Sequence, residues 1–132
     1  MSLSCPIFDC RAAVACAEEA GVSNVCLAPL SAEEATQAFN GDREFYRLKE
    51  RGIDVGSFDC KTILVDPPRA GLDEASLSLT QKFDEVMYIS CNPANLVRDL
   101  ERMPTHKIVS AAVFDQFPWT QHAEVAVKLK RR

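Results

Sequence analysis

The sequence of 132 residues has little that would place it in a membrane, a metal site or a disulfide framework. No apolar run approaches the roughly 18–20 residues that span a bilayer, and the amino terminus has neither the basic start nor the apolar stretch of a secretory signal. None of the six cysteines forms a CxxC pair, which argues against zinc and, without a secretion signal, against disulfides. We therefore expect reduced thiols, no metal, no membrane association and a cytoplasmic location.

Positive charge is also scarce. The net charge is -4 and the isoelectric point about 5.2, whereas a self-sufficient RNA-binding domain usually has a basic surface. The one strongly basic segment, Lys128 to Arg132, is interpreted most simply as a solvated tail. If the substrate is RNA, we expect much of the contact with phosphates to come from outside this chain.

What is present is an ordinary globular composition, with 47% hydrophobic and 26% charged residues, enough for one hydrophobic core. Helix and strand patterns alternate along it, which predicts an α/β fold with a mostly parallel sheet, helices on both faces and an antiparallel last strand. Residues 40–57 are predicted to be a surface connection that is partly helical. The predicted helices are Pro6–Ala20, Ser31–Phe39, Asp73–Lys82 and Pro93–Arg102, and the predicted strands are Asn24–Ala28, Thr62–Val65, Glu85–Ser90, Lys107–Phe114 and Glu124–Leu129.

Two of the predicted strands end in unusual polar turns. One is followed by Asp66-Pro67-Pro68-Arg69 and another by Cys91-Asn92-Pro93. In an open α/β sheet, ligands bind outside the carboxyl ends of the strands, so we expect both turns to open on the same edge. Two prolines stiffen the first turn and can fix the carboxylate of Asp66, and Arg69 can pair with a phosphate, carboxylate or carbonyl. A plain strand-ending turn is the alternative interpretation.

Cys91 lies between a strand and the start of a helix. Asn92 is a favourable helix cap and Pro93 a favourable first helical residue. The partial positive charge of a helix start favours the thiolate, which is the nucleophilic form of cysteine. A packed, unreactive thiol is the other interpretation, and position alone does not choose between them.

A third stretch, Asp115 to Glu124, is dense in aromatic and polar groups. Phe117 and Trp119 can stack on a base. His122 and Glu124 are two residues apart, so on a strand they face the same side, and one of them can serve as a general base. An ordinary loop between two strands is the alternative.

Together the three stretches resemble the tRNA (uracil-5-)-methyltransferase family. The matching residues run in order through the chain, from Asn40-Gly41, which is similar to the tRNA-modifying branch, to the histidine and glutamate near the end. A single Asp-Pro-Pro turn is a weak signal, but the ordered set is specific. The segments that carry the resemblance are Asp66-Pro67-Pro68-Arg69-Ala70-Gly71-Leu72-Asp73, Tyr88-Ile89-Ser90-Cys91-Asn92-Pro93, and Phe114-Asp115-Gln116-Phe117-Pro118 with Thr120, His122 and Glu124.

The resemblance implies a partial Rossmann-like class I methyltransferase fold and a reaction with S-adenosylmethionine as cofactor. Cys91 would add to carbon 6 of a tRNA uridine in the T-loop, and Glu124 would accept the proton from carbon 5. Asp66 would lie near both the cofactor and the base. Arg69, Phe117 and His122 would contact the substrate, whose uridine has to be turned out of its loop.

The chain departs from the family in one respect. The glycine-containing loop that binds the cofactor, and the acidic residue after it, are not visible in the sequence. The RNA-binding domain that precedes them in the family is also not visible. We therefore expect residues 1–132 to be the C-terminal part of the catalytic domain, with little activity alone.

Three other functions compete with this one. An amino-group methyltransferase uses a similar Asp-Pro-Pro turn, but an aromatic residue stands where this chain has Arg69. A cysteine hydrolase would use Cys91, His122 and Glu124 as a triad. A non-catalytic fragment would expose an unpaired sheet edge and dimerise through it.

Overall fold

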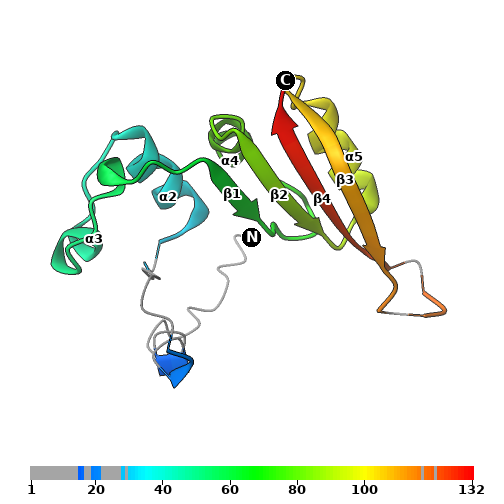
Figure 1. Ribbon diagram of the computed structural model, residues 1–132, viewed down its shortest axis with the longest axis horizontal. Coiled ribbons are helices and arrows are strands. Elements are labelled where there is room, and N and C mark those ends of the chain that lie inside the picture. The colour runs from blue at the N-terminus through cyan, green and yellow to red at the C-terminus, as the bar shows by residue number, and fades with distance from the viewer. Residues whose placement is uncertain (1–14, 17–18, 22–27, 29, 117, 121) are drawn as a thin grey trace. The chain divides into compact units, whose positions relative to one another are not determined.

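The computed structural model describes residues 15–16, 19–21, 28, 30–116, 118–120 and 122–132 (Figure 1). It divides into two compact units, Met1–Phe58 and Asp59–Arg132, which are taken separately below. The predicted helix Pro6–Ala20 and the predicted strand Asn24–Ala28 lie mostly outside the described residues. Within the described part of the chain, no helix is long and apolar enough to cross a membrane.

The first unit contains helix α2, Ala32–Asn40, which begins as the sequence predicts. The Ser31 hydroxyl accepts from the backbone N–H of Glu34 at 3.1 Å, and the Glu34 carboxylate accepts from the backbone N–H of Ser31 at 2.9 Å. This reciprocal pair satisfies two donors that would otherwise lack helical partners. Gly41 ends the helix with φ of 75°, a conformation that glycine adopts without strain.

The connection over residues 40–57 contains two short helical segments. Helix α3 covers Tyr46–Glu50 and the 3₁₀ turn η1 covers Val55–Ser57. The prediction of a partly helical connection is therefore confirmed. Phe45 and Leu48 in this connection are buried.

The second unit is built on a four-stranded sheet with strand order β1-β2-β4-β3 (Figure 1). Strands β1 and β2 are parallel, and β4 is antiparallel to both β2 and β3. Three strands therefore run in one direction and the last runs against them, which confirms the predicted sheet. The strands are β1 Thr62–Val65, β2 Glu85–Ser90, β3 His106–Phe114 and β4 Glu124–Arg131.

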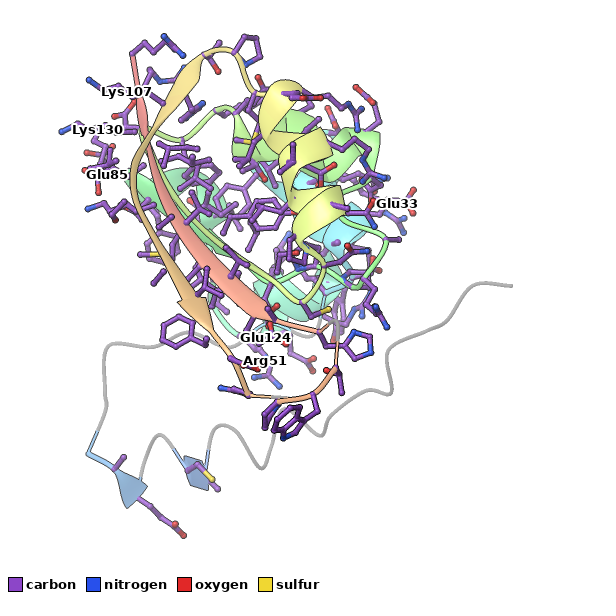
Figure 2. The ribbon with its side chains drawn as sticks, turned by 90° about the vertical axis from the view of Figure 1, so that its right-hand side faces the viewer. Glu33, Arg51, Glu85, Lys107, Glu124 and Lys130 are labelled. Carbon is purple, nitrogen blue, oxygen red and sulfur yellow. The ribbon has the colours of Figure 1, made fainter. Side chains whose placement is uncertain are left out.

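Helix α4, Glu74–Thr80, connects β1 to β2, and helix α5, Pro93–Glu101, connects β2 to β3. Both connections advance across the sheet in the same direction, so right-handed crossovers place both helices on the same face. Figure 2 shows α5 lying along one side of the sheet. The core is on this face and consists of Leu72, Leu77, Val86, Tyr88, Leu96, Met103, Val125, Val127 and Leu129. Helices were predicted on both faces of the sheet, and the described helices of this unit cover one face.

The basic segment at the end of the chain is not a solvated tail. It belongs to β4, whose alternating apolar residues turn toward the core, so the cations between them reach the other face. On that face, Lys128 Nζ lies 3.0 Å from a carboxylate oxygen of Glu85. Arg131 is in step with the apolar residues instead, and its Nε lies 3.1 Å from a carboxylate oxygen of Asp84. The tail interpretation was wrong because the alternation of charged and apolar residues is a strand pattern.

Candidate active site

The turn after β1 is held against the start of α5. The carbonyl oxygen of Arg69 accepts hydrogen bonds from the side-chain amide of Asn92, at 3.2 Å, and from that of Asn95, at 2.6 Å. Asp66 is the first residue after the strand and is exposed. The prediction that the two polar turns open on the same edge of the sheet is therefore confirmed.

Cys91 is the first residue after β2 and a half-buried free thiol. The buried hydroxyl of Ser90 accepts from the backbone N–H of Asn92 and donates to its carbonyl, both at 3.1 Å, which fixes the turn on either side of the cysteine. Pro93 begins α5, as predicted, and Asn92 occupies the cap position without a capping hydrogen bond from its side chain. The amide of Asn92 is instead used on Arg69, so it joins the two turns.

The side chain of Arg69 reaches the third stretch. One guanidinium nitrogen, Nη2, lies 3.2 Å from Nδ1 of His122. Because arginine has no acceptor, Nδ1 of His122 is the acceptor of this hydrogen bond. Arg69 thus contacts the Cys91 turn through its backbone and the β3–β4 loop through its side chain, and all three predicted stretches meet at this residue.

Glu124 is brought beside Cys91 by the position of β4 in the sheet. The last pair of the β2–β4 ladder is Ser90 with Val125. The next residue along the chain from Ser90 is Cys91, and the residue before Val125 is Glu124, so the two flank the last pair of the ladder. Glu124 is half-buried as the first residue of β4. The thiol and a carboxylate therefore lie on neighbouring strand ends at the same edge as Arg69.

The loop between β3 and β4 contains the aromatic and histidine residues that were predicted to contact the substrate. Phe117 lies outside the described residues. Trp119 is fully exposed and has φ of 70°, a left-handed conformation that is uncommon for a bulky residue. His122 is exposed, and its backbone N–H donates to the hydroxyl of Thr120 at 3.2 Å.

A buried carboxylate beneath the site was missed by the sequence reasoning. Asp99 on α5 has no exposed surface, and it accepts from the backbone N–H of Leu72 at 2.8 Å and the hydroxyl of Tyr88 at 2.7 Å. It also accepts from Arg98 Nε at 3.0 Å and Nη2 at 2.8 Å. A signal was available, because Asp99 interrupts an apolar stripe with helical spacing formed by Leu96, Leu100 and Met103.

The network shifts two pKa values in opposite directions. Burial would raise the pKa of Asp99, but hydrogen bonds from Leu72, Tyr88 and Arg98 and the charge of Arg98 outweigh it and leave the pKa lowered. Burial, followed by the hydrogen bond to Asp99 and its charge, raises the pKa of Tyr88. Asp99 is therefore an anion and Tyr88 a neutral donor throughout the neutral pH range.

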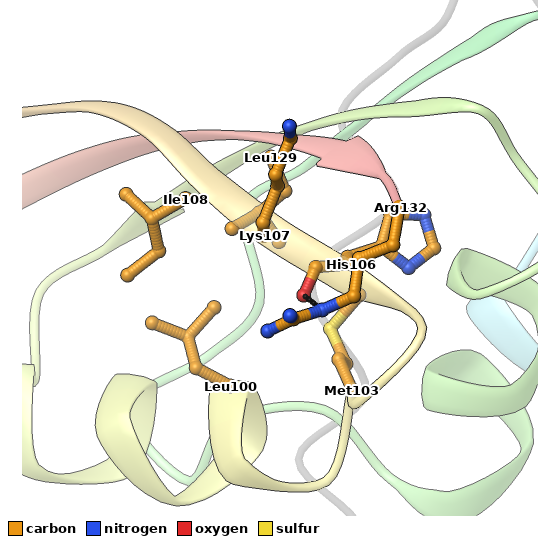
Figure 3. A pocket seen from close by; sticks show the side chains of 7 residues that line it. All are labelled: Leu100, Met103, His106, Lys107, Ile108, Leu129 and Arg132. Carbon is orange, nitrogen blue, oxygen red and sulfur yellow. Dashed lines mark hydrogen bonds between the residues drawn. The ribbon is translucent and has the colours of Figure 1, made fainter.

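A pocket among the described residues lies away from this edge. It has a volume of about 240 Å³ and is lined by residues at the end of α5, the start of β3 and the end of β4 (Figure 3). Those strand ends are paired with each other, as His106 with Arg131, at the opposite end of the ladder from Glu124. In the described part of the chain, no group of three or more histidine, cysteine, aspartate or glutamate side chains is arranged to hold a metal.

The described residues do not form a cradle for a nucleotide-like cofactor. No described strand leads through a loop with several glycines into a helix, and the loop between β1 and α4 contains a single glycine, Gly71. Gly71, which follows β1, has its open side filled, because a Cβ there would lie 2.5 Å from both Arg98 Nη2 and an Asp99 oxygen. Asp66, the residue predicted to contact the cofactor, lies directly after β1.

Comparison with known proteins gives one consistent result. The tRNA (uracil-5-)-methyltransferase family model matches residues 6–132. A tRNA/tmRNA (uracil-C(5))-methyltransferase of Aeromonas hydrophila is 52% identical over 113 residues, which are 85% of this chain and 29% of that protein. The Sulfurovum sp. protein of the same name is 54% identical over 112 residues, 84% of this chain and 30% of its own length.

A solved structure agrees with these sequence matches. It is a Pyrococcus abyssi tRNA (uracil-54, C5)-methyltransferase in complex with S-adenosyl-L-homocysteine, with a TM-score of 0.50 and 30% identity. The match covers 63% of this chain and 24% of that one. The chain therefore spans about three tenths of the length of the curated relatives it matches, and its fold agrees with a partial Rossmann-like methyltransferase fold.

Proposed function

The chain belongs to the tRNA (uracil-5-)-methyltransferase family, and we propose that it carries the nucleophile and the proton acceptor for methylation of carbon 5 of a tRNA uridine. The observation that carries this proposal is the end of the β2–β4 ladder, where Ser90 pairs with Val125, so that Cys91 directly follows one strand and Glu124 begins the other. Arg69 joins the turns around them. A thiol, a carboxylate and a guanidinium at one strand edge match what pyrimidine carbon chemistry requires.

The thiol is needed because carbon 5 of uracil is a weak nucleophile. The Cys91 thiolate forms a bond to carbon 6, and the electrons of the 5,6 double bond move toward carbon 5 and the O4 oxygen as an enolate. When bound, S-adenosylmethionine supplies the methyl group that carbon 5 then takes.

Glu124 completes the cycle as proton acceptor. It removes the proton from carbon 5, the electron pair re-forms the 5,6 double bond, and the bond between carbon 6 and sulfur breaks. Cys91 leaves as the thiolate with which the cycle began. The position of both residues next to the Ser90–Val125 pair supports this role, because a general base has to reach the reacting carbon while the nucleophile is attached to it.

Substrate contacts are assigned to the groups around this pair. We assign to Asp66 the contacts with the target base and the methyl donor, and to Arg69 and His122 contacts with the RNA substrate. Phe117 is assigned as a stacking partner of a base. The uridine, in the T-loop of tRNA, is turned outward to reach them. We propose that the RNA partner is tRNA and that the reaction takes place in the cytoplasm.

The hydrolase alternative has less support. A triad requires the histidine to contact the cysteine, whereas the Nδ1 atom of His122 contacts Arg69. The rest of the methyl-donor site is assigned to the part of the relatives that this chain does not span, so residues 1–132 form the C-terminal part of the catalytic domain.

We expect the isolated chain to methylate RNA little, because its described residues contain no glycine loop for the methyl donor. A chimera in which this chain replaces the segment it matches in the Aeromonas hydrophila relative should transfer tritiated methyl groups to carbon 5 of a T-arm RNA. Comparing both proteins in the same assay tests the proposed function. An inactive chimera that is folded and binds S-adenosylhomocysteine would contradict it, as would robust turnover by the isolated chain.

We also expect the isolated chain to dimerise. Among the described strands, β1 pairs with β2 alone, and Leu64 on β1 is 63% exposed. An unpaired strand edge with exposed apolar side chains favours association. Light scattering at increasing concentration should show a shift from monomer to dimer, whereas in the chimera the restored neighbours should keep this edge covered. A monomer at all concentrations would refute the prediction.

A further inference from the structure

We propose that Asp99 is a positioning residue, which holds the loop that carries Arg69 at the edge where Cys91 and Glu124 lie. The ordering of the loop follows from its hydrogen bonds. The consequence for the reaction rests on the proposed function. Asp99 has no exposed surface, so it cannot touch the substrate and acts only through the residues it contacts.

One face of α5 holds the loop along its whole length. Asn92, Asn95, Arg98 and Asp99 have the spacing that places side chains on the same side of a helix. The two asparagines bind the carbonyl oxygen of Arg69, while Arg98 Nη2 donates to that of Ala70 at 2.8 Å. Asp99 accepts from the next free donor, Leu72 N–H. The helix that begins beside the nucleophile therefore also sets the path of the Arg69 loop.

Gly71 shows how closely the loop approaches the carboxylate. Its φ is +83°, and a Cβ at this position would lie 2.5 Å from both an Asp99 oxygen and Arg98 Nη2. Contacts under 3 Å require one of these groups to move. The backbone of the loop therefore lies directly on the Asp99 and Arg98 side chains, and a shift of either side chain is transmitted to it.

The fold alone does not require a charge at this position. Leu96, Leu100 and Met103 line the same helix face, and an apolar residue between them would usually stabilise a core as well as a buried ion does. Without the carboxylate, however, Leu72 N–H and the Tyr88 hydroxyl would be left without their acceptor. Burying two donors without a partner is unfavourable. The charge thus serves the geometry of the loop.

The first test is hydrogen exchange at the Leu72 amide in the 132-residue chain. In Asp99→Asn we expect this amide to exchange at least about 10-fold faster, because one charge-assisted hydrogen bond is lost. The exchange of the amides of β2 and β4 should be unchanged. Glu101→Gln, at the exposed end of the same helix, is the control. Unchanged exchange at Leu72 in Asp99→Asn would overturn the inference.

A second variant covers the case in which Asp99→Asn does not fold. Arg98→Lys keeps the charge but loses the fork that contacts both Ala70 and Asp99, and the side chain of Arg98 is 46% exposed, so the core is retained. We expect faster exchange at Leu72 here too. A folded Arg98→Lys chain with parental exchange would count against the inference.

The second test measures the reaction itself. Fluorine at carbon 5 cannot leave as a proton does, so T-arm RNA with 5-fluorouridine remains bound to the cysteine after one turnover. With the chimera and excess RNA, the amplitude of adduct formation reports the folded fraction and the rate constant reports positioning. We expect Asp99→Asn to keep the amplitude and to lower the rate constant at least about 10-fold, because small misplacements at a reacting centre are costly.

The outcomes separate the two proposals. A lower amplitude with a parental rate constant would mean a purely structural role for Asp99. Faster exchange at Leu72 with a parental rate constant would overturn the role in the reaction and leave the proposed function intact. If the parental chimera forms no adduct, the proposed function fails, while the exchange experiment still decides whether Asp99 orders the loop.

Discussion

Cys91→Ala in the chimera is expected to abolish both methyl transfer and the covalent adduct with 5-fluorouridine RNA. Without a thiolate, nothing adds to carbon 6, and carbon 5 stays too weak a nucleophile to take the methyl group. Removal of a catalytic nucleophile costs at least about 10³-fold in rate in well-studied enzymes. Denaturing gel electrophoresis of the adduct and tritium release from carbon 5 measure the two effects.

The matched control is Cys60→Ala. Cys60 is a free, exposed cysteine in the same unit, shortly before β1, so its replacement removes a thiol that is more accessible than Cys91 and lies away from the edge. We expect parental adduct formation in this variant. An adduct that persists in Cys91→Ala and disappears in Cys60→Ala would identify Cys60 as the nucleophile and refute the proposed mechanism.

Glu124→Gln is expected to have the opposite effect on the adduct. The glutamine cannot accept the carbon 5 proton, so the methylated ring cannot expel Cys91. With ordinary uridine RNA, a covalent protein–RNA species should accumulate that the parental protein does not retain, while turnover falls by about 10²-fold or more, the usual contribution of a general base. Gel shifts under denaturing conditions, with and without methyl donor, detect it.

Glu101→Gln provides the control for this carboxylate, since Glu101 is exposed at the end of α5. It should turn over like the parent and retain no RNA. If Glu124→Gln loses turnover without retaining RNA, the carboxylate is needed before or during attack by Cys91. The role of Glu124 as the final proton acceptor would then be wrong.

The sequence predicted the local structure of the second unit well. Asp73 caps α4 by accepting from the backbone N–H of Ser76 at 2.7 Å, Pro93 begins α5, and β2 spans Glu85–Ser90 as predicted. Each of these features depends on residues within a few positions of each other, which is why they can be read from spacing. The place of Cys91 between a strand and a helix start belongs to the same class.

The partners of Arg69 could not be predicted in this way. Its contacts with Asn92, Asn95 and His122 join segments that are 23 to 53 positions apart. The sequence showed that these segments are polar and follow strands, and the topology rule brought two of them to one edge. Which atom meets which was decided by the packing of α5 against the loop.

By itself, the sequence determined the family, the strand and helix segments of the second unit, the three polar stretches and the identity of the proposed nucleophile. The tertiary structure decided that β4 lies between β2 and β3, and only this order places Glu124 next to Cys91. It also decided that Asp99 is buried under the Arg69 loop. The physical reason is that capping and periodicity are local, whereas strand order and the partners of a buried charge depend on which distant segments pack together.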